Sequence, residues 1–136
     1  MQSRLSTVAP KLEAALARAG FAKSNEAALA AARPATETCN LADVAPELAA
    51  TRDNLSSIEA LVGVLDEEYF AAHERFENGS APESAYVVPF CRARAASALA
   101  FALRGEASEA VYEAIIATDN LSDVSRTVEH VLAKEA

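Results

Sequence analysis

Glycine is scarce in this sequence, and the loops that depend on it are missing. Only four of the 136 residues are glycine, and they are too scattered to form the backbone cradle of a phosphate-binding loop. The motifs Gly-x-Ser-x-Gly, Glu-x-x-His, His-Glu-x-x-His and Cys-x-x-Cys are absent as well. The sequence therefore lacks the signatures of P-loop proteins, serine hydrolases, di-iron bundles and common zinc sites.

Cysteines and long apolar runs are also few. The two cysteines, Cys39 and Cys91, have no paired spacing, so we expect neither a disulfide scaffold nor a zinc site, and a reducing cytosol is the simplest setting. No apolar run approaches the roughly 18–20 residues of a membrane span. No basic start leads into an apolar stretch, as it would in a secretory leader. We therefore predict a cytoplasmic protein without a membrane partner.

Alanine is the abundant residue, and it predicts an all-α fold. It accounts for 33 of the 136 residues, has the highest helix propensity and lets helix backbones approach closely. Hydrophobic residues make up 51% of the chain, which is enough for one core at this length. We predict a single domain over residues 1–136, a compact bundle of six or seven short antiparallel helices.

Apolar periodicity and helix-ending residues divide the chain into segments. The expected helices cover about residues 6–19, 24–33, 41–51, 56–77, 84–104, 106–118 and 121 onward. Pro34 disfavours a continuing helix, so residues 34–39 are expected to form a connector. Ser24 and Asn40 are expected to cap the helices that follow them.

The tetrapeptide Asp-Asn-Leu-Ser occurs at residues 53–56 and again at 119–122. Each copy suits a helix joint whose serine caps the next helix, and Ser56 with Glu59 forms a capping box. The repeat permits two similar helical hairpins, or a coincidence of two turns. Two copies are too few for a solenoid. The repeat indicates architecture and no activity.

Acidic residues outnumber basic ones, and the net charge is −8. This balance argues against DNA or RNA as a partner, because phosphate binding requires a concentrated basic surface. The charge is +3 over residues 1–34, −9 over 35–85 and −2 over 86–136. A basic N-terminal region beside an acidic middle indicates complementarity within the fold or between subunits, or else solvated helix faces.

The segment from residue 66 to residue 77 holds the densest group of polar side chains. Five of them are predicted to form an acidic interaction surface: Asp66, Glu67, Glu68, His73 and Glu74. His73 and Glu77 are four residues apart, so they share a helix face with Tyr69 and could hold a ligand or metal. The alternative is an exposed acidic face in which His73 pairs with Glu77 and Tyr69 packs in the core.

A candidate ligand pocket combines this segment with the helix that follows. Its candidate residues are Tyr69, His73, Glu77, Cys91 and Arg94. Neighbouring arginines favour a reactive thiolate at Cys91, whereas its apolar stripe favours a buried thiol that acts as a small hydrophobe. Arg94 could belong to an anion pocket with Arg92 and Arg104. The alternative is that these arginines neutralise acids on a neighbouring helix, such as Glu106, Glu109 or Glu113.

Three functional hypotheses remain, and none carries an assigned catalytic residue, metal ion or cofactor. The leading one is a non-enzymatic interaction module that binds another protein or itself through the acidic surface. The second is a ligand- or metal-binding bundle with the pocket above, which includes the case of an enzyme. The third is a structural homo-oligomer in which residues 1–34 pack on a neighbour's acidic middle. The stretch 93–116 looks like helical hairpins of small bacterial proteins, which favours a bacterial source.

Overall fold

The computed structural model describes residues 3–43 and 54–134, and all regular structure in this part of the chain is helical. The helices follow in the order α1 (Arg4–Val8), α2 (Pro10–Ala19), α3 (Phe21–Thr38), η1 (Leu41–Asp43), α4 (Leu55–Glu77), α5 (Ser84–Arg104), α6 (Ala107–Thr118) and α7 (Leu121–Ala133). The short η1 is a 3-10 helix. The predicted compact all-α bundle is confirmed.

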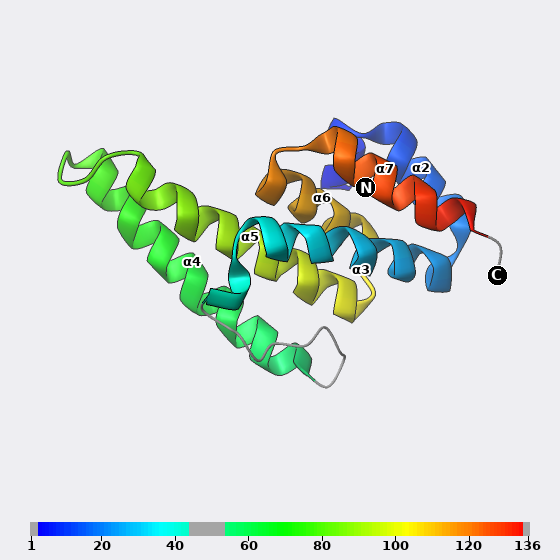
Figure 1. Cartoon of the computed structure of the whole chain (residues 1–136), viewed down its shortest axis with the longest axis horizontal. Helices are drawn as coiled ribbons and strands as arrows, with labels where there is room; N and C mark the ends of the chain where they lie inside the picture. The colour runs from blue at the N-terminus through cyan, green and yellow to red at the C-terminus, as the bar shows by residue number, and fades with distance from the viewer. Residues whose placement is uncertain (1–2, 44–53, 135–136) are drawn as a thin grey trace.

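The molecule consists of a body and a projecting helical hairpin (Figure 1). In the body, α3 packs against α2, α5, α6 and α7. Helix α4 packs chiefly against α5, and the two run antiparallel. The outer part of this hairpin extends past the ends of α3 and α6 (Figure 1). We call this outer part, residues 67–90, the arm.

Alanine forms much of the body's core, as its abundance predicts. Helix α3 buries a face of small residues: Ser24, Ala27, Ala28, Ala31, Ala32 and Ala35. Helix α5 presents a similar face over residues 93–103, so α3 and α5 can lie close together. Larger side chains fill the remaining space, among them Leu5, Val111 and Val128, which are almost fully buried.

Helix α3 contradicts the prediction of a connector at residues 34–39. It continues through Pro34 to Thr38, although the proline ring removes one helical hydrogen bond, that of its own missing N–H. The buried alanines on both sides of Pro34 belong to one continuous face, and their packing favours a continuous helix. Ser24 does not cap this helix, because its hydroxyl lies inside and donates to the carbonyl oxygen of Leu16 at 2.6 Å.

The helix starts also differ from the prediction. The first expected helix is divided at Ala9 into α1 and α2, and α2 starts at Pro10. In both Asp-Asn-Leu-Ser copies the asparagine, rather than the serine, occupies the cap position. Asn120 accepts a hydrogen bond from the Asp123 N–H, whereas Ser56 lies inside α4. Asparagine is as good a cap as serine. Asn120 caps α7 with its side chain, whereas Asn54 occupies the cap position of α4 without a side-chain cap hydrogen bond.

Other expectations fall on the edge of the described residues. The helix predicted over residues 41–51 begins with the 3-10 turn Leu41–Asp43, and its remainder lies outside the described residues. Asn40 has a positive φ of 55° and does not have the extended backbone of a helix cap. The comparison of two helical hairpins needs residues 44–53, which lie outside the described residues, so the choice between duplication and coincidence is untested.

Helices α4 and α5 meet along a seam with the three-and-four spacing of a coiled coil. On α4 the seam residues are Ile58, Val62, Leu65, Tyr69, Ala72 and Phe76. On α5 they are Tyr86, Phe90, Ala93, Ser97, Ala100 and Arg104. Small residues on α5 face large ones on α4 near the body, and aromatic residues face each other in the arm.

Helix α5 is also long and apolar enough to cross a membrane by length and composition alone. Half of its most apolar window is buried inside the protein, which is what the core helix of a bundle also shows. Among the described residues it is the one helix with these properties.

Two glycines provide a test of the helix joints. Gly105 follows α5 with a φ of +83°, and an added Cβ would lie 2.9 Å from the Phe21 ring. Gly105→Ala should lower the free energy of unfolding by about 1–2 kcal/mol, because an L-residue is strained in this conformation. Chemical denaturation measures the change.

Gly63 is the matched control, because it is exposed inside α4 and an added Cβ would meet nothing within 4 Å. Gly63→Ala should raise the free energy of unfolding by up to about 1 kcal/mol through helix propensity. Equal effects of the two substitutions would contradict the assigned joint.

Candidate functional site

Aromatic side chains hold the arm together. On α4, Tyr69, His73 and Phe76 share one helix face, and Tyr86 and Phe90 of α5 pack against them. Ring centroids are 4.8 Å apart for His73 and Tyr86 and 5.2 Å apart for Tyr69 and Phe90. Each such pair contributes about 0.5–1.5 kcal/mol beyond its buried area. The arm thus has its own small core, separate from the body.

The arm holds a disproportionate share of the chain's aromatic residues. The sequence has eight Phe and Tyr residues, and five of them lie between residues 67 and 90: Tyr69, Phe70, Phe76, Tyr86 and Phe90. Tyr69, Phe76, Tyr86 and Phe90 pack against one another within the arm. Phe70 is the member of this group that is exposed.

His73 lies inside this cluster and makes the predicted pair with Glu77. Its Nδ1 is 2.8 Å from the Glu77 carboxylate, one helical turn away. The Tyr69 ring lies 5.7 Å from the imidazole, centroid to centroid. Partial desolvation, together with nearby Glu83 and Tyr69, raises the pKa of the Tyr86 phenol above its usual value. The three predicted residues Tyr69, His73 and Glu77 are therefore together.

Part of the arm's surface is apolar and uncovered. Phe70 is 64% exposed, and Val87 and Val88 are each 50% exposed. Phe70 is one helical turn beyond Asp66, on the side of α4 from which Asp66 contacts Arg94 of α5. Val87 and Val88 lie four and three residues before Cys91, on the α5 stripe that packs into the body. We call Phe70, Val87 and Val88 the docking face.

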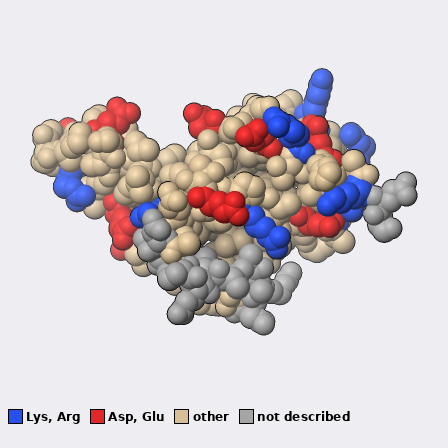
Figure 2. All heavy atoms as spheres, viewed as in Figure 1, with Lys and Arg blue, Asp and Glu red and all other residues tan. Residues whose placement is uncertain are grey.

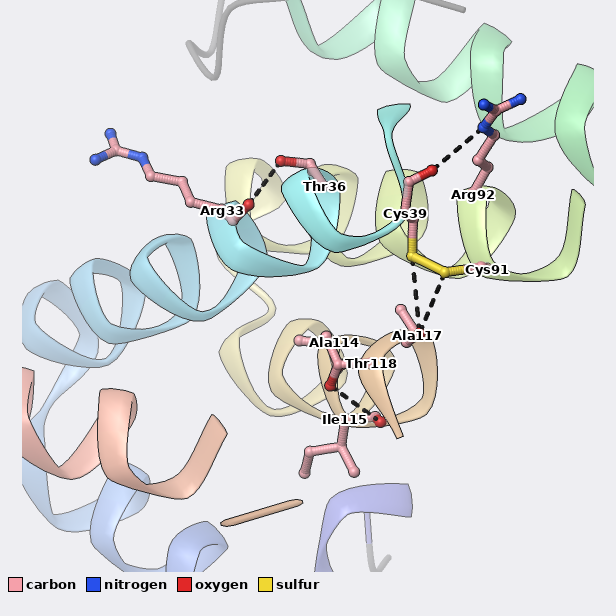
Figure 3. Close-up of a disulfide and its surroundings, with 9 residues drawn as sticks. All are labelled: Arg33, Thr36, Cys39, Cys91, Arg92, Ala114, Ile115, Ala117 and Thr118. Carbon is pink, nitrogen blue, oxygen red and sulfur yellow. Dashed lines mark hydrogen bonds between the residues drawn. A yellow bond between two sulfur atoms is a disulfide. The ribbon is translucent and has the colours of Figure 1, made fainter. Parts of the chain in front are cut away.

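The docking face is uncovered because α3 and α6 both end beside Cys91 of α5 and do not reach residues 84–90. Cys39, the residue that caps the end of α3, forms a disulfide with Cys91. The carbonyl oxygen of Ala117, next to the last residue of α6, lies 3.3 Å from the Cys91 sulfur and 3.7 Å from the Cys39 sulfur (Figure 3). A disulfide sulfur carries no hydrogen, so in the bridged form these are close contacts. Residues 84–90 of α5 extend beyond both helix ends.

The disulfide corrects the sequence prediction for both cysteines. Cys91 is neither a reactive thiolate nor a free buried thiol, because its sulfur is bonded to Cys39. The 52 residues that separate them gave no spacing signal, since tertiary packing alone brings α3 and α5 together. Arg92 adds a further link across this joint, with its Nε donating to the Cys39 carbonyl oxygen at 3.2 Å.

A network of ion pairs stands between the arm and the body. Arg94 of α5 contacts Asp66 of α4 at 2.7 Å and Glu113 of α6 at 3.0 Å. Glu113 is only 1% exposed, and Arg4 of α1 contacts it from the other side at 2.9 Å. A buried carboxylate requires such partners. Arg4 also pairs with Glu109.

Two of the three arginines, Arg94 and Arg104, show the neutralising role that was one of the two sequence alternatives. Arg94 pairs with Glu113, and Arg104 pairs with Glu106 and Glu59. The hydrogen bond to Glu59 is the largest effect on the pKa of Arg104; desolvation opposes it, the bond to Glu106 adds to it, and the pKa is raised. For Arg4, burial opposes the charge, but the bonds to Glu109 and Glu113 outweigh it and the pKa is raised.

The structure divides the two predicted residue sets. Of the acidic surface, Glu67, Glu68 and Glu74 are exposed on the arm, while Asp66 is held by Arg94 and His73 by the aromatic cluster. Of the ligand pocket, Cys91 and Arg94 are committed to the disulfide and the ion pairs, away from the other three residues. Sequence reasoning missed the docking face, although the cluster of aromatic residues between 69 and 90 was a visible signal.

Four hollows lie elsewhere on the described surface. One between α3 and α7, of about 130 Å³, is lined by Thr38, Thr118, Asn120 and their neighbours. Two wider ones, of about 660 and 330 Å³, surround the exposed ring of Phe21, and a fourth of about 160 Å³ lies between α4 and α5. None of these four is lined by Tyr69, His73 or Glu77.

Comparison with known proteins adds no functional information. No protein-family model, curated protein or solved structure matches the chain.

The disulfide should contribute strongly to stability. The bridge closes a loop of 52 residues. Reduction should therefore lower the free energy of unfolding by about 3–4 kcal/mol. Thermal melts with and without a dithiol reductant measure this. The double variant Cys39→Ala/Cys91→Ala is the control, and its melting temperature should not respond to the reductant. A wild-type protein that is equally insensitive would contradict the bridge.

Glu113 should be the critical acid of the ion-pair network. Glu113→Gln removes the charge shared by Arg4 and Arg94, and it should lower the free energy of unfolding by about 3 kcal/mol. Glu109→Gln is the matched control, because Glu109 pairs with Arg4 nearer the surface and should cost less than about 1 kcal/mol. Urea denaturation of both variants compares them, and similar losses would contradict the assigned roles.

Proposed function

We propose that this protein is a non-enzymatic interaction module whose arm docks another protein. One observation carries the proposal: the arm extends past α3 and α6 and leaves an apolar stripe uncovered. The described chain has seven exposed large hydrophobic residues. Three of them, Phe70, Val87 and Val88, lie on the arm. Exposed apolar residues gathered on one projecting element are typical of binding surfaces.

The chemistry of the arm supports binding over catalysis. Next to the arm, Cys91 is in the disulfide and Arg94 is paired with Asp66. Within the arm, His73 is paired with Glu77. Tyr69 and His73 pack in the arm's own core, where they stiffen the hairpin. A rigid hairpin that presents apolar side chains loses little conformational entropy on binding.

A matched pair of phenylalanine variants tests the proposal. Phe70 in the arm and Phe21 in the body are both exposed, at 64% and 71%. A protein captured from native extract on the wild-type chain should be purified and titrated against each variant. Phe70→Ser should weaken binding by about 10-fold, because a buried aromatic anchor is lost. Phe21→Ser should bind like the wild type.

Circular dichroism and thermal melts must first show that both variants keep the fold. Equal affinity of the Phe70 and wild-type proteins for the purified partner would rule out the arm as the docking site. The same holds for a partner whose binding depends on Phe21 instead.

A further inference from the structure

We infer that the arm's partner is a basic amphipathic helix, which lies along the docking face in line with α3 and α6. This inference rests on the proposed function and names the chemistry of its partner. Three features of the structure support it: the shape of the uncovered stripe, the charge around it, and the orientation of the two helix ends that border it.

The shape of the site fits a helix. In the body, the α5 stripe that contains Cys91 packs against the helices α3 and α6. Val88 and Val87 continue this stripe at the same spacing, three and four residues before Cys91. A surface that already accepts helices along most of its length presents the same ridges and grooves to one more. Figure 2 shows an indentation in the outline of the molecule between the arm and the body.

The charge around the site fits a basic partner. The arm carries five carboxylates and one arginine, a net charge of −4 with His73 neutral. Phe70 has Glu67 three residues before it, Glu74 four residues after it and Glu77 seven residues after it, so acids flank it along the helix. Glu67 and Glu74 have no ion-pair partner among the described residues. A partner helix whose apolar stripe is flanked by lysine or arginine would complement these glutamates.

The helix ends that border the site add to the negative potential. Helices α3 and α6 both present their C-terminal ends to it, and these are the negative ends of the helix dipoles. Glu37 and Asp119 are exposed at the same two ends. If a partner helix lay in line with α6, its positive N-terminal end would be attracted to these negative helix ends and to the two acidic side chains.

The same charges disfavour a second copy of the chain as the occupant. Two arms that met face to face would each bring a net charge of −4 into the contact. Like charges at an interface oppose association, most strongly at low salt. A symmetric dimer through the docking face is therefore the less favourable occupant.

Two synthetic peptides test the inference directly. The first is a short Leu/Lys peptide whose leucines repeat at three and four, and the second is the matched Leu/Glu peptide. The Leu/Lys peptide should bind and protect backbone amides of residues 69–77 and 84–91 in hydrogen exchange. Raising the salt from about 50 to about 500 mM should weaken its binding by about 10-fold. The Leu/Glu peptide should not bind.

Variants separate the apolar and the charged contributions. Val87→Ser/Val88→Ser should weaken Leu/Lys binding by about 10-fold through lost apolar contact. Glu67→Gln/Glu74→Gln should weaken it by about 3- to 10-fold. The charge-matched control is Glu26→Gln/Glu129→Gln, which changes the net charge equally on α3 and α7 and should leave the affinity unchanged.

The outcomes distinguish this inference from the proposed function. Protection away from the arm, or equal effects of the two glutamate pairs, would overturn the basic partner, and so would failure of the Leu/Lys peptide to bind. If Phe70→Ser still released the natural partner, the arm would remain the docking site for a partner of another kind. A dimer in solution that Val87→Ser/Val88→Ser dissociates would identify a second copy as the occupant and overturn the inference.

Discussion

The junction at Cys91 is the constraint from which the shape of the molecule follows. There the end of α3 is bonded covalently to α5, and the last turn of α6 contacts both sulfurs. Because α3 and α6 stop at this level while α5 continues, one helix belongs to the body in its C-terminal part and to the arm in its N-terminal part. The apolar stripe of α5 is buried on one side of the junction and exposed on the other.

The charges are organised around the same junction. Arg94 lies three residues inside it and gathers Asp66 and Glu113, so the carboxylates nearest the body are neutralised within the fold. The acids beyond the junction remain available to solvent, and these include Glu67 and Glu74. Asp66 and Glu113 are thus neutralised next to the junction, whereas Glu67 and Glu74 contribute to the negative charge of the arm.

The disulfide also bears on the setting in which the protein folds. A bridge that closes a long loop is most useful to a small domain whose core is built largely from alanine, because alanine buries little apolar area per residue. Disulfides persist mainly in oxidising compartments. The cytoplasmic location predicted from cysteine spacing stays a prediction, and its premise of unpaired cysteines is wrong.

The sequence by itself determined the helical class, most helix ends and the pairing of His73 with Glu77, because these depend on residues within one or two turns of each other. Asn78-Gly79 and Gly105 ended helices where their backbone preferences predicted. Only the tertiary structure decided that α3 runs through Pro34, that Cys39 meets Cys91, and that Val87 is exposed although it continues the buried stripe of α5. Each of these depends on where another helix begins or ends in space, and local periodicity carries no information about that.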